Sequence, residues 1–306
     1  MKKFFEEYGA VAIIVIVIAV LLLIVGSVKG LDEGTGKVRG SGVASIVGNA
    51  YSNAIDKFKD SFDNVLTGNS DNSTKTLVSK NESQVGKYAD VDGDGIVDGV
   101  IFADLMIGGS GEYGTNGYGG YTITKISSCK DYYVSQNSYT NKIGGTAEVL
   151  TPIGNGNDRF YVMALNDIDL NSHDWYNAAN SKINDHKTLT NEKFGNGKNN
   201  TTTMISKWNV EVYGSKNSCL DHTDLWNEIQ TQAGNGWFVP SSAEWSAFGT
   251  NLGLTRSNYS SKGLKAYYWT SSLRNVSYAY TFNLNSEYID YSIINSSDYV
   301  RLATTF

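Results

Sequence analysis

Acidic side chains recur at alternate positions in one short stretch of the sequence. Asp90, Asp92 and Asp94 are followed by a glycine, which permits a sharp turn, and then by Asp98. Ca²⁺ prefers about six to eight hard oxygen ligands, which carboxylates and backbone carbonyls supply. The spacing therefore predicts a calcium site with Ca²⁺ as its cofactor, formed by Asp90, Asp92, Asp94, Asp98 and the backbone carbonyl of Ile96.

This acidic stretch differs from an EF-hand, because its twelfth position holds Ile101 where an EF-hand has a bidentate acid. It resembles instead the D-x-D-x-D-G-x-x-D loops of thrombospondin type-3 and similar extracellular repeats, and this resemblance implies a calcium-binding loop. The alternative is a pair of Asp-Gly turns that lead into a strand over residues 100–106 without any metal. The sequence leaves both interpretations open.

Side chains for catalysis are scarce. The chain has two cysteines and three histidines, and the histidines lack the spacing of a metal site. The glycine-rich stretches lack the following Lys-Ser/Thr pair of a phosphate-binding loop. We therefore predict a binding protein and not an enzyme. Cys129 and Cys219 could form one disulfide in a domain outside the cytoplasm.

The composition favours a recognition surface. Of the 306 residues, 20 are Tyr and 32 are Gly. Tyr combined with Asn, Ser and Gly is typical of contact surfaces, because Tyr offers a large area at little entropic cost. The formal net charge is −6, with 25 Lys and Arg against 31 Asp and Glu. Because phosphate-backbone binding needs a concentrated cationic face, we predict no nucleic-acid partner.

The elements that must position such a surface are clearest in the last third of the chain. Ser241 and Glu244 form a capping-box pattern, which predicts the start of a helix. Residues 278–284 alternate between large apolar side chains and small or polar ones, which predicts a strand with two different faces. Residues 268–272 and 299–303 are also strand-like.

Three motifs in this region carry a family resemblance. They are G-W-F-V-P-S-x-x-E-W over 236–245, Y-W-T-S-S over 268–272 and Y-V-R-L over 299–302. They resemble the C-type-lectin-like group of formylglycine-generating enzymes, certain bacterial domains of unknown function and the variable proteins of diversity-generating retroelements. The resemblance implies a C-type-lectin-like domain over residues 87–306. The enzymes of this group need paired cysteines, which the matching segment lacks, so it implies no catalysis here.

The variable proteins of that group concentrate Asn, Ser, Tyr and Asp at varied positions near the C-terminus. Residues 256–299 have the same bias. The resemblance therefore implies a diversified surface that binds an external protein or glycan ligand, and the alternative is a polar β-rich surface without special meaning. The predicted ligand-binding residues are Tyr267, Arg274, Asn275, Tyr278, Asn283, Asn285, Glu287, Tyr288, Asp290 and Tyr291.

An uncharged run of Ala, Val, Ile and Leu extends over residues 10–25. With its neighbours it gives about 20 residues, enough to cross roughly 30 Å of hydrocarbon as a helix. The preceding F-F-E-E-Y-G-A over 4–10 resembles the start of Flp/Tad-type, type IV-like pilins. This resemblance implies that Glu7 fixes the register of identical subunits in a helical filament after a membrane-inserted stage. A plain membrane anchor and a cleaved signal peptide are the alternatives.

Four segments follow from these observations: a transmembrane or pilin-like helix over 1–30, an amphipathic stalk helix over 31–66, a polar linker over 67–86 and a ligand-binding domain over 87–306. The stalk is predicted because apolar residues between 43 and 66 recur at spacings of three and four. The predicted fold class is α+β, with a long N-terminal hydrophobic helix and a stalk followed by a C-type-lectin-like mixed α/β domain.

The hypothesis is thus a pilin-like subunit that displays a diversified adhesin domain at the prokaryotic cell surface. One alternative is a phage or prophage receptor-binding protein of the same fold, which has no use for a membrane helix. The other is an extracytoplasmic enzyme on a scaffold like that of the formylglycine-generating enzymes, which the missing cysteine pair disfavours.

Overall fold

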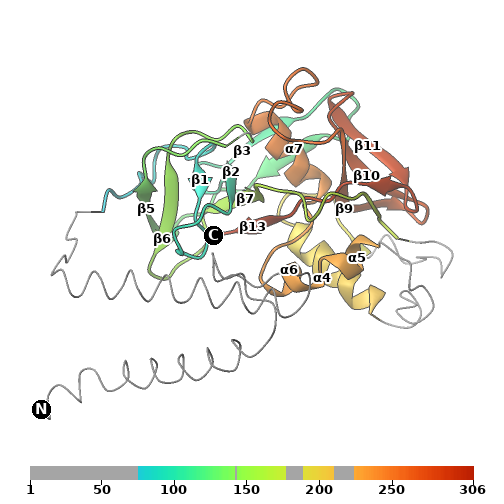
Figure 1. Cartoon of the computed structure of the whole chain (residues 1–306), viewed down its shortest axis with the longest axis horizontal. Coiled ribbons are helices and arrows are strands. Elements are labelled where there is room, and N and C mark those ends of the chain that lie inside the picture. The colour runs from blue at the N-terminus through green and yellow to red at the C-terminus, as the bar shows by residue number, and fades with distance from the viewer. Residues whose placement is uncertain (1–74, 142, 177–188, 210–223) are drawn as a thin grey trace, which may run out of the picture. The chain divides into compact units, whose positions relative to one another are not determined.

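The computed structural model describes residues 75–141, 143–176, 189–209 and 224–306 (Figure 1). The chain divides into two compact units, Met1–Thr74 and Lys75–Phe306, and every described residue belongs to the second. The helices predicted over 1–30 and 31–66, together with Glu7, therefore lie outside the described residues.

A six-stranded sheet has the strand order β13-β7-β2-β1-β6-β5. All of its pairs are antiparallel except the parallel pair of β1 and β6. Residues 99–104 form a central strand because this short apolar run is buried along its whole length. The strands are β1 (Tyr88–Ala89), β2 (Gly99–Asp104), β5 (Asp131–Gln136), β6 (Val149–Ile153), β7 (Phe160–Ala164) and β13 (Ala303–Thr305).

The strand β13, which comes from the C-terminal part of the sequence, forms one edge of this sheet. It pairs with β7, and the carbonyl of Phe306 accepts hydrogen bonds from the backbone N–H groups of Arg159 and Phe160. The Phe306 ring is 2% exposed and packs edge-on against Tyr132, with ring centroids 5.2 Å apart. The sheet core therefore depends on residues that are far apart in the sequence.

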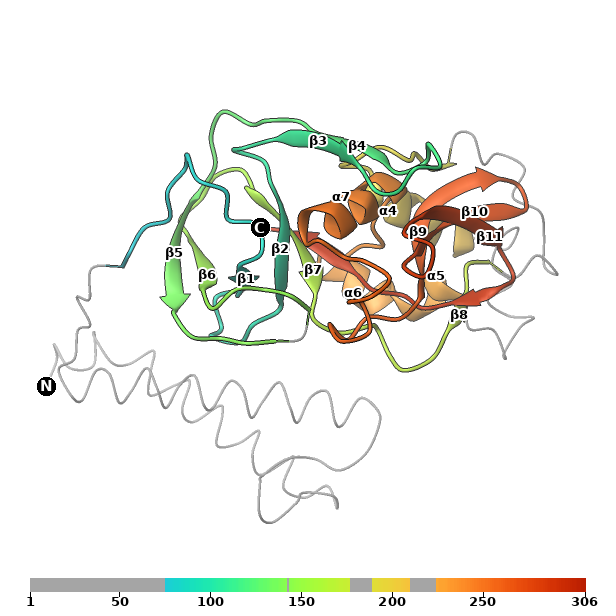
Figure 2. The ribbon, with the colours of Figure 1, turned by 90° about the horizontal axis from the view of Figure 1, so that it is seen from above.

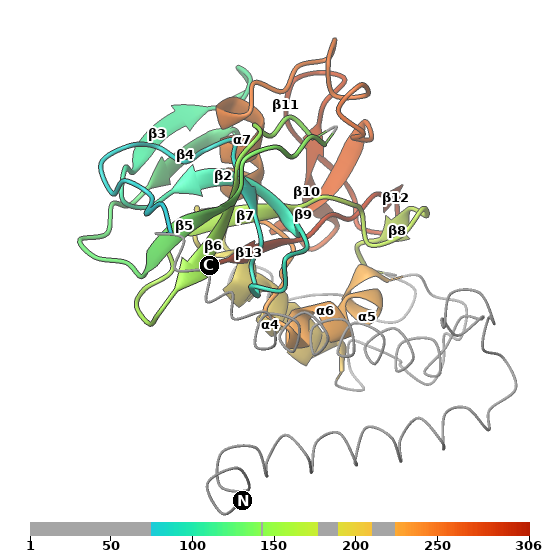
Figure 3. The same cartoon turned by 60° about the vertical axis from the view of Figure 1, so that its left-hand side comes forward.

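A second, three-stranded antiparallel sheet has the order β11-β10-β9. Two smaller sheets pair β3 with β4 and β8 with β12, and the latter pair lies beside β9 (Figure 3). These strands are β3 (Gly109–Glu112), β4 (Gly120–Ile123), β8 (His173–Asp174), β9 (Tyr267–Asn275), β10 (Tyr278–Asn283), β11 (Tyr288–Ile293) and β12 (Ser297–Asp298).

Helix α7 (Ser242–Asn251) lies between the two larger sheets (Figure 2). It begins directly after its N-cap residue Ser241, because the Ser241 side chain accepts a hydrogen bond from the Glu244 N–H, while the Glu244 carboxylate accepts one from the Ser241 N–H. On its buried face Trp245 is stacked between Tyr268 and Phe282, each 4.9 Å away between ring centroids. The other helices are α4 (Gly197–Trp208), α5 (Leu225–Glu228) and α6 (Gln230–Gly234).

The predicted α+β fold class is wrong for the part of the chain that the structure describes. This part consists mainly of β-sheets, with four helices of 4 to 12 residues. None of the described helices has the length and apolar character needed to cross a membrane. The physical reason is that the apolar runs, such as 99–104 and 160–164, have strand length and are separated by glycine- and asparagine-rich turns.

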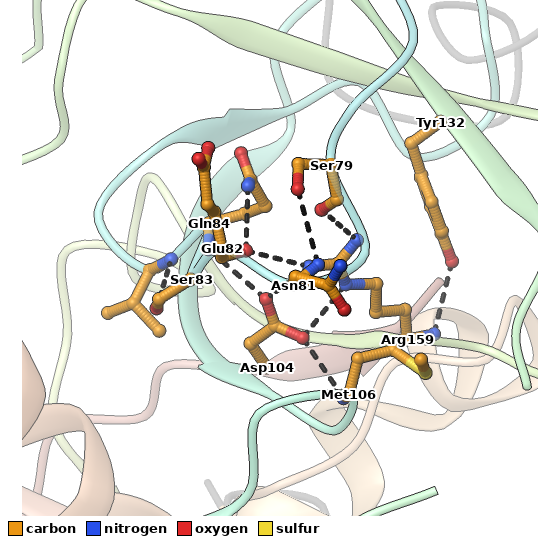
Figure 4. Close-up of polar contacts among 10 residues, drawn as sticks. Ser79, Asn81, Glu82, Ser83, Gln84, Asp104, Met106, Tyr132 and Arg159 are labelled. Atoms are coloured by element: carbon orange, nitrogen blue, oxygen red, sulfur yellow. Dashed lines mark hydrogen bonds and ion pairs between the residues drawn. The ribbon is translucent and has the colours of Figure 1, made fainter. Parts of the chain in front are cut away.

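Residues 75–86, the described part of the predicted linker, pack against the six-stranded sheet. Leu77 forms a bridge with Tyr133 of β5. The Arg159 guanidinium donates to the carbonyls of Ser79 and Glu82 at 2.8 and 2.9 Å (Figure 4). The same guanidinium forms a bidentate pair with the carboxylate of Asp104, at 2.8 Å for both contacts. This buried ion pair holds the start of the domain against β2 and β7.

Candidate functional site

Exposed aromatic side chains gather around one cation on the three-stranded sheet. We define the Arg274 patch as Tyr118, Arg274, Tyr278, Tyr291 and Ile293. The Arg274 guanidinium carbon lies 3.5 Å from the centre of the Tyr291 ring and 5.7 Å from that of Tyr118. Tyr278 meets Tyr291 edge-to-face at 5.6 Å. The arrangement holds a cation between two tyrosine rings that solvent can reach.

Strand register explains why the patch residues of β10 and β11 share one face with Tyr280. Tyr280 lies opposite Tyr291, and Tyr278 opposite Ile293, so all four project to the same side of β10 and β11. Farther along this face Phe282 enters the core under α7. Tyr291 and Ile293, in contrast, are 37% and 48% exposed. The patch is therefore the part of this sheet face that α7 leaves uncovered.

The patch rests on a buried tyrosine. The Tyr280 side chain is 4% exposed and lies 5.6 Å from the Tyr118 ring. Burial, followed by the charge of Glu192 and its hydrogen bond, raises the pKa of the Tyr280 phenol above its ordinary value. Tyr280 therefore provides a buried, uncharged neighbour on which the Tyr118 ring packs.

The structure brings together four of the predicted contact residues. Arg274, Tyr278 and Tyr291 belong to the patch, and Asn275 pairs with Tyr278 at its border. Two members that sequence reasoning missed are Tyr118, from the loop before β4, and Ile293. No sequence pattern indicated that Tyr118 belongs to the patch, because the loop between β3 and β4 is far from β9 in the sequence. Ile293 could have been found from its two-residue spacing after Tyr291.

The other six predicted contact residues lie toward the opposite end of the sheet, around the turn between β10 and β11. Asn283 is 3% exposed and its amide contacts Asp290, so it is not on the surface that a ligand contact requires. Asn285 accepts a hydrogen bond from the Tyr259 hydroxyl, and Glu287 accepts one from the Arg256 N–H. The remaining three are Tyr267, Tyr288 and Asp290, of which Tyr267 is 39% exposed.

The acidic loop brings three of its predicted ligands together. One carboxylate oxygen from each of Asp90, Asp92 and Asp98 lies within 4.8 Å of the others. Burial, and then the charges of the neighbouring aspartates, raises the pKa of Asp98 to about 6. Asp94 is not part of this group, and its carboxylate accepts a hydrogen bond from the Ile96 N–H instead. The donor set of hard carboxylate oxygens suits Ca²⁺.

The predicted disulfide falls partly outside the described residues. Cys129 is half-buried, and burial is the main cause that raises the pKa of its thiol. Cys219 lies in the segment 210–223, which the structure does not describe. The disulfide therefore stays a prediction.

Comparisons with protein-family models, with curated proteins and with solved structures found no match to this chain.

Proposed function

We propose that residues 75–306 form a recognition domain that binds an external ligand through the Arg274 patch. The observation that carries this proposal is the Arg274 guanidinium held over the Tyr291 ring on an exposed sheet face. Tyr and Arg are the side chains that most often dominate binding energy at protein interfaces. The exposed Ile293 adds apolar area beside them. This composition favours a protein surface as the ligand, with a glycan as the alternative.

The buried scaffold favours a surface whose exposed residues can be substituted without unfolding the domain. Farther along the same sheet face, where α7 covers it, Trp245, Tyr268 and Phe282 form a buried aromatic stack. Ordered aromatic anchors on a rigid base lose little conformational entropy when they bind. The resemblance of residues 236–306 to retroelement-variable proteins supports a diversified ligand surface in the same place. In this proposal the first thirty residues display the domain at the cell surface as a pilin-like segment, and repetition of subunits raises avidity.

Binding to arrayed ligands tests the proposal. The full-length chain, kept in solution with detergent, is applied to an array of purified extracellular proteins and to a glycan array. We expect protein spots whose signal falls at least tenfold with Arg274→Ala or Tyr291→Ala. Arg256→Ala is the matched control, because it removes the same charge outside the patch, and it keeps the signal. If glycan spots, and not protein spots, lose their signal with Arg274→Ala or Tyr291→Ala, the ligand is a glycan. If neither variant weakens any signal, the Arg274 patch is not the binding site.

We also propose that the acidic loop binds Ca²⁺ through Asp90, Asp92 and Asp98. The support is the convergence of their carboxylate oxygens within 4.8 Å. A bound ion would offset the mutual repulsion of these charges, and a ligand at about 100 times its Kd stabilises a fold by about 2.7 kcal/mol. We expect Ca²⁺ to raise the melting temperature of the full-length chain and Asp92→Asn to abolish the rise. Asp131→Asn, outside the loop, should keep it. An unchanged melting temperature in Ca²⁺ would reject the calcium proposal.

A further inference from the structure

A cavity of about 570 Å³ opens beside the β3–β4 hairpin and is separate from the Arg274 patch. Strand β4 forms one wall, and residues 193–194 with the first turn of α7 form the other. Its volume falls within the range of small-molecule sites, about 300–1,000 Å³. The residues that line it are Gly111, Gly120, Tyr121, Thr122, Thr124, Lys193, Phe194 and Ala243.

The lining combines rings with hydroxyl groups. The half-buried Phe194 contributes aromatic surface and is held by the Tyr161 ring 4.6 Å away, whereas Tyr121 is largely buried and its hydroxyl donates to Asn251. Thr122 of β4 and Thr124, which directly follows this strand, alternate along the chain, so their exposed side chains share one face. A ligand that fits has an apolar face for the Phe194 ring and several hydroxyls for the threonines, which is the chemistry of a saccharide.

Lys193 is the one charged residue in this lining. Its backbone is fixed, because its N–H donates to Asn191 and its carbonyl accepts from the Ser241 hydroxyl. Its exposed ammonium makes no ion pair with any residue that the structure describes. A single cation at the wall, without an ion-pair partner among the described residues, matches a ligand with one negative charge.

The start of α7 does not add an anion site here. The N–H groups of Ser242, Ala243 and Glu244 are all used within the protein, by Ser272, the Glu192 carbonyl and Ser241. A phosphate, with up to two negative charges, therefore finds Lys193 as the one cation in this lining. A carboxylate, with one negative charge, is the better match.

We propose that this cavity binds an acidic saccharide unit, with the Lys193 ammonium facing its carboxylate and the Phe194 ring facing the sugar ring. This inference goes beyond the proposed function, because it assigns a second site with its own ligand class.

Gly120 makes the cavity testable without disturbing the fold. A Cβ atom at Gly120 would meet nothing within 4 Å, and the backbone there is not in the left-handed region. Gly120→Trp therefore fills the cavity. Gly234, at the exposed end of α6, has the same free surroundings and provides the control Gly234→Trp. Lys198→Gln, on α4, matches the charge change of Lys193→Gln outside the cavity.

The experiment measures glucuronate and glucose binding to the full-length chain by calorimetry and saturation-transfer NMR, in a detergent without a sugar head group. We expect millimolar binding of glucuronate, about ten times weaker binding of glucose, and a similar loss for Lys193→Gln. Gly120→Trp should abolish binding, while both controls and Arg274→Ala keep it. No glucuronate binding, equal binding of glucose, or full binding by Lys193→Gln would overturn the proposal. Because Arg274 lies in the patch and not in the cavity, unchanged glucuronate binding by Arg274→Ala shows that the two sites are tested independently.

Discussion

Arg159 and Asp104 form an ion pair whose side chains are both only 1% exposed. Removing one partner of a buried pair leaves an uncompensated charge and costs about 3–5 kcal/mol. We expect Arg159→Met to lower the free energy of unfolding by this amount, measured by urea denaturation. Lys80→Met, which removes the exposed pair with Asp131, should cost far less, because solvent screens that pair. Equal losses of stability in the two variants would contradict the conclusion that Arg159 holds the start of the domain against β2 and β7.

Asp298 makes stability depend on pH. One of its carboxylate oxygens is buried without a hydrogen-bond partner among the described residues, and burial raises its pKa to about 6. Because this pKa lies above the ordinary value of 3.8, the folded state holds the proton more tightly than the unfolded state. The contribution of Asp298 to stability is therefore complete below about pH 3.8 and is lost as the pH rises through 6.

Asp298→Asn tests this dependence. We expect the variant to lose less stability than the original chain between pH 4 and pH 7, on the order of 1 kcal/mol. Urea denaturation at several pH values measures the difference. Parallel curves for the two proteins would show that the Asp298 carboxyl does not titrate as its burial implies.

At the level of single residues, clusters of charge within one short loop were easier to predict from the sequence than contacts between distant residues. Asp90, Asp92 and Asp98 converge in a loop whose Gly93 and Gly95 have positive φ, but Asp94, the third of the alternating acids, lies outside the group. The contact between Arg274 and Tyr118 could not be predicted. It joins β9 to a loop more than a hundred residues earlier, and no local pattern records such a pairing.

Helix α7 is packed so closely that one glycine has no room for a side chain. A Cβ atom at Gly249 would lie 2.6 Å from the Tyr113 ring and 2.8 Å from Phe282. Alanine normally stabilises a helix interior by about 1 kcal/mol relative to glycine. Overpacking in a core costs about 1–3 kcal/mol and should outweigh this gain.

We therefore expect Gly249→Ala to lower the melting temperature. Gly234→Ala, where the new methyl group meets nothing within 4 Å, should leave it unchanged or raise it. Thermal unfolding followed by circular dichroism compares the two. A higher melting temperature for Gly249→Ala would show that α7 has more freedom against β10 than its contacts imply.

Two elements were confirmed because their signals are local. The capping box at Ser241 and Glu244 starts α7, and the alternation over 278–284 corresponds to β10. The exposure of β10 was not predictable from the same alternation. Both of its faces are largely buried, because α7 covers part of one face and the cluster around Trp269 covers the other. Periodicity identifies a strand, but its neighbours decide which residues solvent reaches.

The whole domain depends on its final strand. Without residues 303–306, β7 would keep its pairing with β2 but would lose its other partner strand and the hydrogen bond from the Phe160 N–H to the Phe306 carbonyl. We expect a chain that stops after Leu302 to lose its cooperative urea transition and its near-ultraviolet circular dichroism. Phe306→Leu, which keeps the strand and most of the apolar volume, should retain both and cost less than about 1.5 kcal/mol. A cooperative transition in the shortened chain would contradict this dependence.

The fold class was mispredicted because the assembly of sheets rests on pairs far apart in the sequence. The parallel pairing of Tyr88 with Val149 and the antiparallel pairing of Met163 with Ala303 leave no trace in short-range patterns. The resemblance of residues 236–306 rests on local motifs, and from them a mixed α/β architecture was extended over a part that is mostly sheet.

The late position of β13 has a consequence for synthesis of the protein. Until β13 has been synthesised, β7 has an unpaired margin, and the ring that fills the space beside Tyr132 does not yet exist. Exposed strand margins invite association between nascent chains. Folding of this domain therefore cannot be completed before β13 emerges from the ribosome, and any delay before that point prolongs the interval in which neighbouring chains can pair.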